Sequence, residues 1–299
     1  NRGSVYLVKE LKADTGSGHN VKKTVFMECG WSDKQEGPKH LKVVGETEAV
    51  VEQVKESKKT SGAVISGIVS RADLTLGEEV IEVLEAHQEA SQGLFRGIRH
   101  AGARAEHPEA LSIPGQAPEG LFEDPAFLTG MKVLGKNGFT YDTWHYYYQN
   151  RDFAEMAKKV PGTQIVLDHF GTPLGVGPYA DKREEIFTQW QEDINEISKL
   201  ENVVIKIGGM AMPDNGFGWD TRVTPATSDE FVEAQRRYYL HAIDCFGPER
   251  CMMESNFPVD RRSLSYHVLY NGLKKIVFDF SDNEKHQMFY GTAERIYNV

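Results

Sequence analysis

The chain has 299 residues, of which 40% are hydrophobic and 26% charged, as is usual for a globular protein. Its formal net charge is −10, and Lys and Arg are mixed with Asp and Glu, which argues against nucleic acid or an anionic membrane as a partner. No apolar run approaches the ~20 residues of a membrane span. Three cysteines, Cys29, Cys245 and Cys251, are too few for a disulfide framework. We therefore expect a cytoplasmic protein with buried, reduced thiols.

Short apolar, β-branched runs alternate with longer amphipathic segments along the chain. In chain order, the predicted strands are Thr24–Cys29, Ala63–Val69, Phe95–His100, Phe139–His145, Gln164–His169, Val203–Gly208 and Cys251–Asn256. The predicted helices between them are Gly45–Ser61, Gly77–Ser91, Asp152–Lys159, Lys182–Leu200 and Asp229–Phe246. Ser228 and Asp229 are the predicted N-terminal cap of the last helix.

This alternation predicts parallel strands joined by right-handed helical crossovers, which is an α/β fold. A TIM (β/α)8 barrel uses about 250 residues as one domain, so we expect residues 1–299 to form a single β/α-barrel domain. Seven strands are visible where a barrel has eight, and none precedes Thr24. Either the barrel is incomplete, or its first strand is missing or truncated at the N-terminus, which begins Asn1-Arg2-Gly3-Ser4. We favour the second interpretation.

Polar side chains gather where the predicted strands end, and in a parallel barrel these ends form the face that carries the active site. They are Arg99, His100, His145, the run Tyr146–Gln149, Asp168, His169, Lys206, Glu254, Ser255, Asn256 and Asp260. Charges and imidazoles are costly to bury unless they are paired, so function is a natural explanation. One strand-end histidine is often structural, but histidines at three neighbouring ends are harder to explain in that way.

Several of these residues also have a structural interpretation. The rigid, forked guanidinium of Arg99 suits the binding of a substrate carboxylate, but Arg99 could pair with a structural carboxylate instead. Lys206 fits a salt-bridged position inside the barrel as well as it fits a substrate ligand. Tyr147 and its neighbours are expected to form a pocket wall. The loops Ser112–Gly120 and Gly209–Thr227 each follow a strand, and we expect them to decide substrate identity.

Five motifs at or beyond these strand ends carry a resemblance to a known family. They are Phe95–His100 (FRGIRH), Leu167–Gly171 (LDHFG), Lys206–Met210 (KIGGM), Glu254–Asp260 (ESNFPVD) and Thr292–Tyr297 (TAERIY). In order and spacing they resemble the amidohydrolase-related (amidohydrolase 2) family of TIM-barrel hydrolases, in particular its branch of sugar-lactone and 2-pyrone-dicarboxylate lactonases. The likeness runs from about Thr24 to the end of the chain.

The resemblance implies a hydrolase that opens a lactone or similar cyclic ester of a small carboxylated substrate. In such enzymes a His-x-His pair on the first strand, a His on the sixth and an Asp on the eighth can hold a divalent metal, most often zinc. The metal lowers the pKa of its bound water to about 7. His169 falls on the sixth-strand position and is the tentative metal ligand. The first-strand pair would precede Asn1, and Asn256 stands where the family often has Asp.

These departures leave the catalytic base open. Asn is not a base at neutral pH, so His169, Asp260 or His145 would have to serve beside Asn256. Relatives commonly carry Trp-x-Tyr-His-Pro-Gln at the fifth strand, where this chain has Tyr147 in place of the His. The residues expected to bind substrate are Arg99, His100, Tyr147, Gln149 and Lys206.

The expected partner is a small organic acid or lactone, with neither nucleic acid nor membrane, and a homo-oligomer is possible. Two alternatives remain open. One is a decarboxylase or hydratase on the same fold. The other is a catalytically inactive barrel that binds a small acid, which the Asn256 position and the changed fifth strand both motivate.

Overall fold

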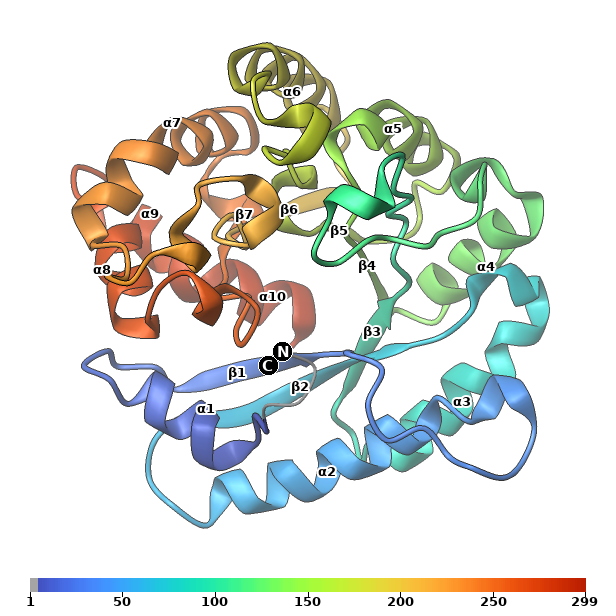
Figure 1. Ribbon diagram of the computed structural model, residues 1–299. Coiled ribbons are helices and arrows are strands. Elements are labelled where there is room, and N and C mark those ends of the chain that lie inside the picture. The colour runs from blue at the N-terminus through green and yellow to red at the C-terminus, as the bar shows by residue number, and fades with distance from the viewer. Residues whose placement is uncertain (1–4) are drawn as a thin grey trace.

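The computed structural model describes residues 5–299, so Asn1-Arg2-Gly3-Ser4 lie outside the described residues. Seven strands form one sheet in sequence order, each parallel to the next (Figure 1). They are β1 (Lys23–Met27), β2 (Val64–Arg71), β3 (Phe95–Arg99), β4 (Thr140–Thr143), β5 (Ile165–Leu167), β6 (Val203–Ile207) and β7 (Cys251–Met253). The α/β-barrel fold expected from the sequence is confirmed, one strand short of eight within residues 5–299.

Most of the helices surround the curved sheet on its outer side (Figure 1). The helices are α1 (Val8–Thr15), α2 (Val44–Lys58), α3 (Val80–Ala90), α4 (Pro125–Lys136), α5 (Asn150–Lys159), α6 (Arg183–Ser198), α7 (Ser228–Phe246), α8 (Tyr266–Ile276), α9 (Asp282–His286) and α10 (Thr292–Tyr297). Of these, α10 reaches the barrel interior with Tyr297. None of the helices in the described part of the chain has the length and apolar character needed to cross a membrane.

Two apolar layers hold the strands in place, because the strands are buried on both faces. The larger layer lies between the sheet and helices α3 to α8 and contains Phe127, Trp190 and Tyr239. The smaller layer lies inside the barrel, where Val69, Val166, Val204 and Met252 from different strands meet Tyr297 of α10. Helical side chains thus contribute to the barrel interior.

The sheet has its two edges at β1 and β7 in the part of the chain that is described. On the outer side, α1 packs against both α2 and α8, and so bridges the helices that follow these edge strands. Lys12 of α1 donates from Nζ to the carbonyl oxygen of Ser57 (2.6 Å) in the last turn of α2 and to that of Thr60 (2.7 Å) just beyond it. A cation at a helix C-terminus is favourable because the last carbonyls there lack partners.

The predicted elements agree with the structure in order and differ at their ends. Strands β3, β4, β5 and β7 end before His100, His145, Asp168 and Glu254, respectively, which the sequence prediction placed inside them, whereas β6 includes Lys206 as predicted. At β5 the reason is visible, since His169 and Phe170 have φ of 54° and 59° and turn the chain out of the sheet. Helices α1, α4, α8, α9 and α10 have no counterpart among the predictions.

All three cysteines are free, but Cys29 is exposed, so the expectation that all are buried was wrong.

The predicted cap of α7 was wrong by one residue. Thr227 is the N-cap: its Oγ1 accepts from the backbone N–H of Glu230 at 3.2 Å, and the Glu230 carboxylate accepts from the backbone N–H of Thr227 at 2.8 Å. Such a reciprocal pair satisfies two helix-end donors at once. Ser228 is already the first helical residue.

Replacing this cap should destabilise the protein measurably. We expect Thr227→Ala to lower the free energy of unfolding by about 1 kcal/mol, because one backbone donor at the start of α7 loses its acceptor. Ser228→Ala is the matched control and should change it by less than about 0.5 kcal/mol. Urea denaturation followed by circular dichroism measures both. An equal loss in the two variants would contradict the assignment of Thr227 as the cap.

Candidate active site

The carboxyl ends of the strands hold a group of buried charged side chains, the strand-end cluster, formed by Glu28, Arg99, Asp142, Asp168 and Lys206. Nζ of Lys206 in β6 lies 2.9 Å from Asp142 Oδ2 and 2.9 Å from Asp168 Oδ1. Both aspartates are fully buried, and Lys206 is 5% exposed. A cation buried this deeply is tolerated because two anions face it.

The members of the cluster set one another's charge. Burial acts to lower the pKa of Lys206, but Asp142 and Asp168 outweigh it and raise that pKa well above the ordinary value. Burial acts to raise the pKa of Asp168, but the charges of Lys206, His169 and Arg99 hold it below the ordinary value. For Asp142, burial prevails and the pKa is raised. At neutral pH, Lys206 therefore stays an ammonium and Asp168 a carboxylate.

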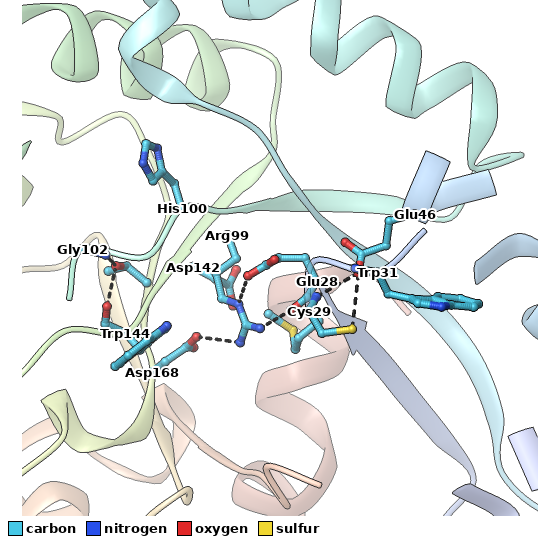
Figure 2. Close-up of polar contacts among 12 residues, drawn as sticks. Glu28, Cys29, Trp31, Glu46, Arg99, His100, Gly102, Asp142, Trp144 and Asp168 are labelled. Atoms are coloured by element: carbon cyan, nitrogen blue, oxygen red, sulfur yellow. Dashed lines mark hydrogen bonds and ion pairs between the residues drawn. The ribbon is translucent and has the colours of Figure 1, made fainter. Parts of the chain in front are cut away.

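Arg99, the last residue of β3, links the cluster to the end of β1 (Figure 2). Its Nε donates to Glu28 Oε1 at 2.9 Å, another guanidinium nitrogen donates to the Glu28 carbonyl, and Nη1 lies 3.6 Å from Asp168 Oδ2. Beside it, the buried carboxylate of Glu46 in α2 accepts from two backbone N–H groups of the loop after β1. The structural pairing considered for Arg99, and the interior salt bridge considered for Lys206, are both present.

His169 follows β5 and pairs with a carboxylate that follows β7. Its Nδ1 lies 2.6 Å from Glu254 Oε1, so Nδ1–H donates to Glu254. Nε2 makes no hydrogen bond with any residue in 5–299, and the residue is 6% exposed. Burial acts to lower the pKa of His169, but the charges of Glu254 and Asp168 outweigh it and raise that pKa. The hydrogen bond at Nδ1 thus orients the ring, and Nε2 is left without a protein partner among these residues.

Two glycines after β6 make room for this pair. A Cβ on Gly209, whose φ is +73°, would lie 2.3 Å from His169 Nδ1, and a Cβ on Gly208 would lie 2.4 Å from Glu254 Cγ. Neither approach is sterically possible for a residue with a side chain. The Gly-Gly of the motif at Lys206–Met210 is therefore explained by the His169–Glu254 pair that crosses over it.

Asp260 is a second buried acid near His169. It accepts from Asn256 Nδ2 at 2.8 Å and from the backbone N–H of Ala211 at 3.2 Å. Burial raises the pKa of Asp260 to about 7, although these hydrogen bonds and the charge of His169 act against the rise. Asn256 adopts a φ of +50°, which Asn tolerates better than most residues. The pKa of Asp260 thus lies near neutral pH, and a catalytic acid–base role for Asp260 stays a prediction.

His145 and His100 make structural hydrogen bonds instead of joining the cluster. His145 is fully buried, with Nε2 3.0 Å from Asn150 Oδ1, and burial lowers its pKa to about 4. Nδ1 of His100 accepts from the backbone N–H of Leu74 at 3.2 Å, and its ring points away from Arg99 in Figure 2. Their roles in the reaction stay predictions.

Tyr147 and Gln149 lie in the turn after β4. Tyr147 is buried against two other tyrosines, which agrees with a wall position. The Gln149 side chain donates to the carbonyl of Gly102 at 2.9 Å and accepts from the N–H of Arg104 at 3.1 Å. Gln149 thus fixes the loop after β3, and substrate contact by either residue stays a prediction.

One carboxylate ties together the two loops expected to decide substrate identity. Asp214, buried in the loop after β6, accepts from the backbone N–H groups of Ser112 at 2.7 Å and Ile113 at 3.1 Å in the loop after β3. The loops Ser112–Gly120 and Gly209–Thr227 therefore share an anchor.

Glu28, Asp142 and Tyr297, whose hydroxyl donates to Asp142, are absent from the strand-end residues that the sequence analysis singled out. Asp168 and Glu254 were named there without a role in binding or catalysis. Glu28 and Asp142 are acids in apolar strand-like runs, the same signal that singled out Lys206, so the sequence contained the means to find them. Glu254 stands within a motif but has no feature that pairs it with His169. Tyr297 comes from a helix and carries no such signal.

The donor groups at the strand ends do not make a complete metal site. Within residues 5–299, no group of three or more His, Cys, Asp or Glu side chains could hold an ion. The cluster carboxylates already face Lys206 or Arg99, and Glu254 faces His169. The described residues supply His169 as a single candidate ligand, so a zinc ion there stays a prediction.

The match to known proteins settles the family. A sequence model described as amidohydrolase matches residues 52–299, which include every strand except β1. The chain belongs to the amidohydrolase family. Relatives of this amidohydrolase include the uncharacterized protein y4mH of Sinorhizobium fredii, 29% identical over 98% of this chain and 86% of that one. Another is L-fucono-1,5-lactonase of Burkholderia multivorans, 25% identical over 68% of this chain and 64% of that one.

Solved structures agree on the fold of this amidohydrolase. An amidohydrolase from Burkholderia multivorans with bound HEPES has a TM-score of 0.73 at 21% identity and covers 98% of this chain and 89% of that one. A structure of an amidohydrolase from the same organism with bound zinc has the same TM-score and coverage at 20% identity.

The raised pKa of Asp260 predicts a pH-dependent stability. Between the ordinary value of 3.8 and about 7, the folded protein holds a proton that the unfolded chain has lost, so Asp260 makes stability fall as pH rises through this window. Asp260→Asn removes this titration. We expect the free energy of unfolding of the wild type, relative to Asp260→Asn, to decrease from about pH 4 to about pH 7 and then level off.

Urea denaturation of both proteins across this pH range measures the difference, in which the other titrating groups largely cancel. A difference that stays constant with pH would show that Asp260 is already ionised at low pH in the folded protein.

Proposed function

We propose that this amidohydrolase opens a lactone or similar cyclic ester of a small carboxylated substrate with activated water. The observation that carries the proposal is the 2.6 Å contact between His169 Nδ1 and Glu254. A carboxylate on one ring nitrogen fixes the tautomer and stabilises the imidazolium that forms when the other nitrogen takes a proton. His169 Nε2 is therefore suited to act as the general base.

The proposed reaction is a hydrolysis in which His169 accepts the proton of the attacking water. The water oxygen attacks the lactone carbonyl carbon while its proton passes to His169 Nε2. The ring C–O bond then breaks, and the leaving alkoxide takes the proton from His169 Nε2, which gives an open hydroxy acid and restores the base. Asp260, with a pKa raised to about 7, can hold or return a proton near neutral pH.

We propose Arg99 as the group that receives the substrate carboxylate. Its Nε and a second nitrogen are used by Glu28, but Nη1 has only the 3.6 Å contact with Asp168. An arginine held on one side by protein carboxylates presents its remaining donors in a fixed direction.

The relative named L-fucono-1,5-lactonase supports a lactone as the bond that is opened. A decarboxylase on the same fold, or an inactive barrel that binds a small acid, would use the same strand-end residues. The three functions differ in product: ring-opened acid, carbon dioxide, or none.

Replacing His169 should abolish lactone opening and leave the fold intact. We expect His169→Asn to lower kcat/KM at least about 100-fold, because the base is lost while the amide N–H can still donate to Glu254. A panel of sugar lactones and carboxylated lactones, followed by the acid that ring opening releases, measures this activity. His241→Asn is the control, since His241 lies on α7 and bonds to the carbonyl of Gln191 away from the strand ends.

Wild-type turnover in the His169→Asn variant would contradict the role of His169. Carbon dioxide release without ring-opened acid would favour the decarboxylase. Tight binding of a carboxylated lactone with no turnover by the wild type would favour the inactive barrel.

A further inference from the structure

The C-terminal helix places a tyrosine inside the barrel. In Figure 1, α10 lies beside β1 with the C-terminus near the middle of the view. Tyr297 is 2% exposed and packs with Val69, Val166, Val204 and Met252, side chains of β2, β5, β6 and β7. The side chain of Tyr297 therefore belongs to the interior of the barrel, although its neighbour Asn298 is exposed.

The hydroxyl of Tyr297 ends at the strand-end cluster. It donates to Asp142 Oδ2 at 2.5 Å, and Lys206 Nζ lies 2.9 Å from the same oxygen. Lys206 Nζ also lies 5.7 Å from the centre of the Tyr297 ring. The other oxygen of Asp142 accepts from Thr140 Oγ1 at 3.0 Å. Asp142 is thus held by three donors, and only Tyr297 comes from outside the sheet.

We propose that Tyr297 is a positioning residue of the active site, acting through Asp142, Lys206 and Asp168 on His169. Asp142 and Asp168 share one ammonium group, so a change in the charge or position of Asp142 moves Lys206 relative to Asp168. Asp168 directly precedes His169, and its charge favours the protonated imidazole. The proposal rests on the proposed function in that His169 is taken as the base.

The physical reason is that the hydroxyl is a neutral donor that favours the ionised form of Asp142 beside a second carboxylate. Hydrogen bonds to the charged form of an acid favour that form. Burial and the charge of Asp168 both disfavour the ionised form of Asp142. Without the hydroxyl, Lys206 is the one charged donor that opposes them. Asp142 then takes up a proton more readily, and Lys206 is drawn toward Asp168.

Tyr297→Phe removes this donor and keeps the packed ring. Tyr290→Phe is the matched control: Tyr290 donates to Glu294 Oε1, also at 2.5 Å, on the outer side of the chain end and away from the cluster. The first measurement separates kcat from KM on a lactone that the wild type opens. We expect Tyr297→Phe to lower kcat about 10-fold or more with KM unchanged, and Tyr290→Phe to change neither.

The second measurement does not depend on turnover. Proteins labelled with carbon-13 at the aspartate carboxyl carbons report the titration of Asp142, which faces Lys206, Asp168 and Tyr297. We expect Tyr297→Phe to move this titration upward by roughly one pH unit, and Tyr290→Phe to leave it in place.

A Tyr297→Phe protein with wild-type kcat, or with a changed KM alone, would overturn the positioning role, as would an unmoved titration of Asp142. Wild-type protein that opens no lactone would count against the proposed function, and the titration of Asp142 then decides by itself whether Tyr297 controls the cluster.

Discussion

The rest of the strand-end region depends on one buried cation, Lys206, held between Asp142 and Asp168. Three neighbouring strands, β4, β5 and β6, contribute one member each at or directly after their ends, so the contact fixes the ends relative to one another. Arg99 extends the arrangement to β3 and, through Glu28, to β1. Removing one partner of such a buried pair typically costs about 3–5 kcal/mol, because the remaining charge has no compensation. The arrangement therefore resists the small displacements that an active site cannot tolerate.

Asp168 and Asp260, two buried aspartates near His169, differ in pKa because their surroundings differ. Asp168 is buried beside two protein cations, and they hold its pKa below the ordinary value. Asp260 is buried with two neutral donors, Asn256 and a backbone N–H, and its pKa rises to about 7. Two identical side chains thus acquire different pKa values from their environments alone.

The sequence predicts the strands well because short, continuous apolar runs are typical of parallel strands that are buried on both faces. It predicts their ends poorly, because polar residues such as Asp168 and His169 continue the run in sequence while the backbone already turns. His169 is recognisable as a strand-end residue, but its partner Glu254 is 85 positions further along the chain, and no local pattern joins them. Tyr297 is harder still, since its role arises only when a helix packs into the barrel interior. Conversely, His145 and His100 carry the same local signal as His169, and the structure gives them neighbours in helices and loops instead.

The shared anchor at Asp214 has a consequence for how substrate range can change. A loop that is fixed only at its own two ends can lengthen, shorten or vary independently of its neighbours. Here the loop after β3 is also held in its middle by a carboxylate from the loop after β6. A deletion or insertion in the loop after β3 displaces the backbone donors, and one in the loop after β6 displaces the carboxylate that accepts from them. New specificities should therefore arise through paired changes in both loops, and a mutagenesis library that varies only one of them would sample mostly damaged proteins.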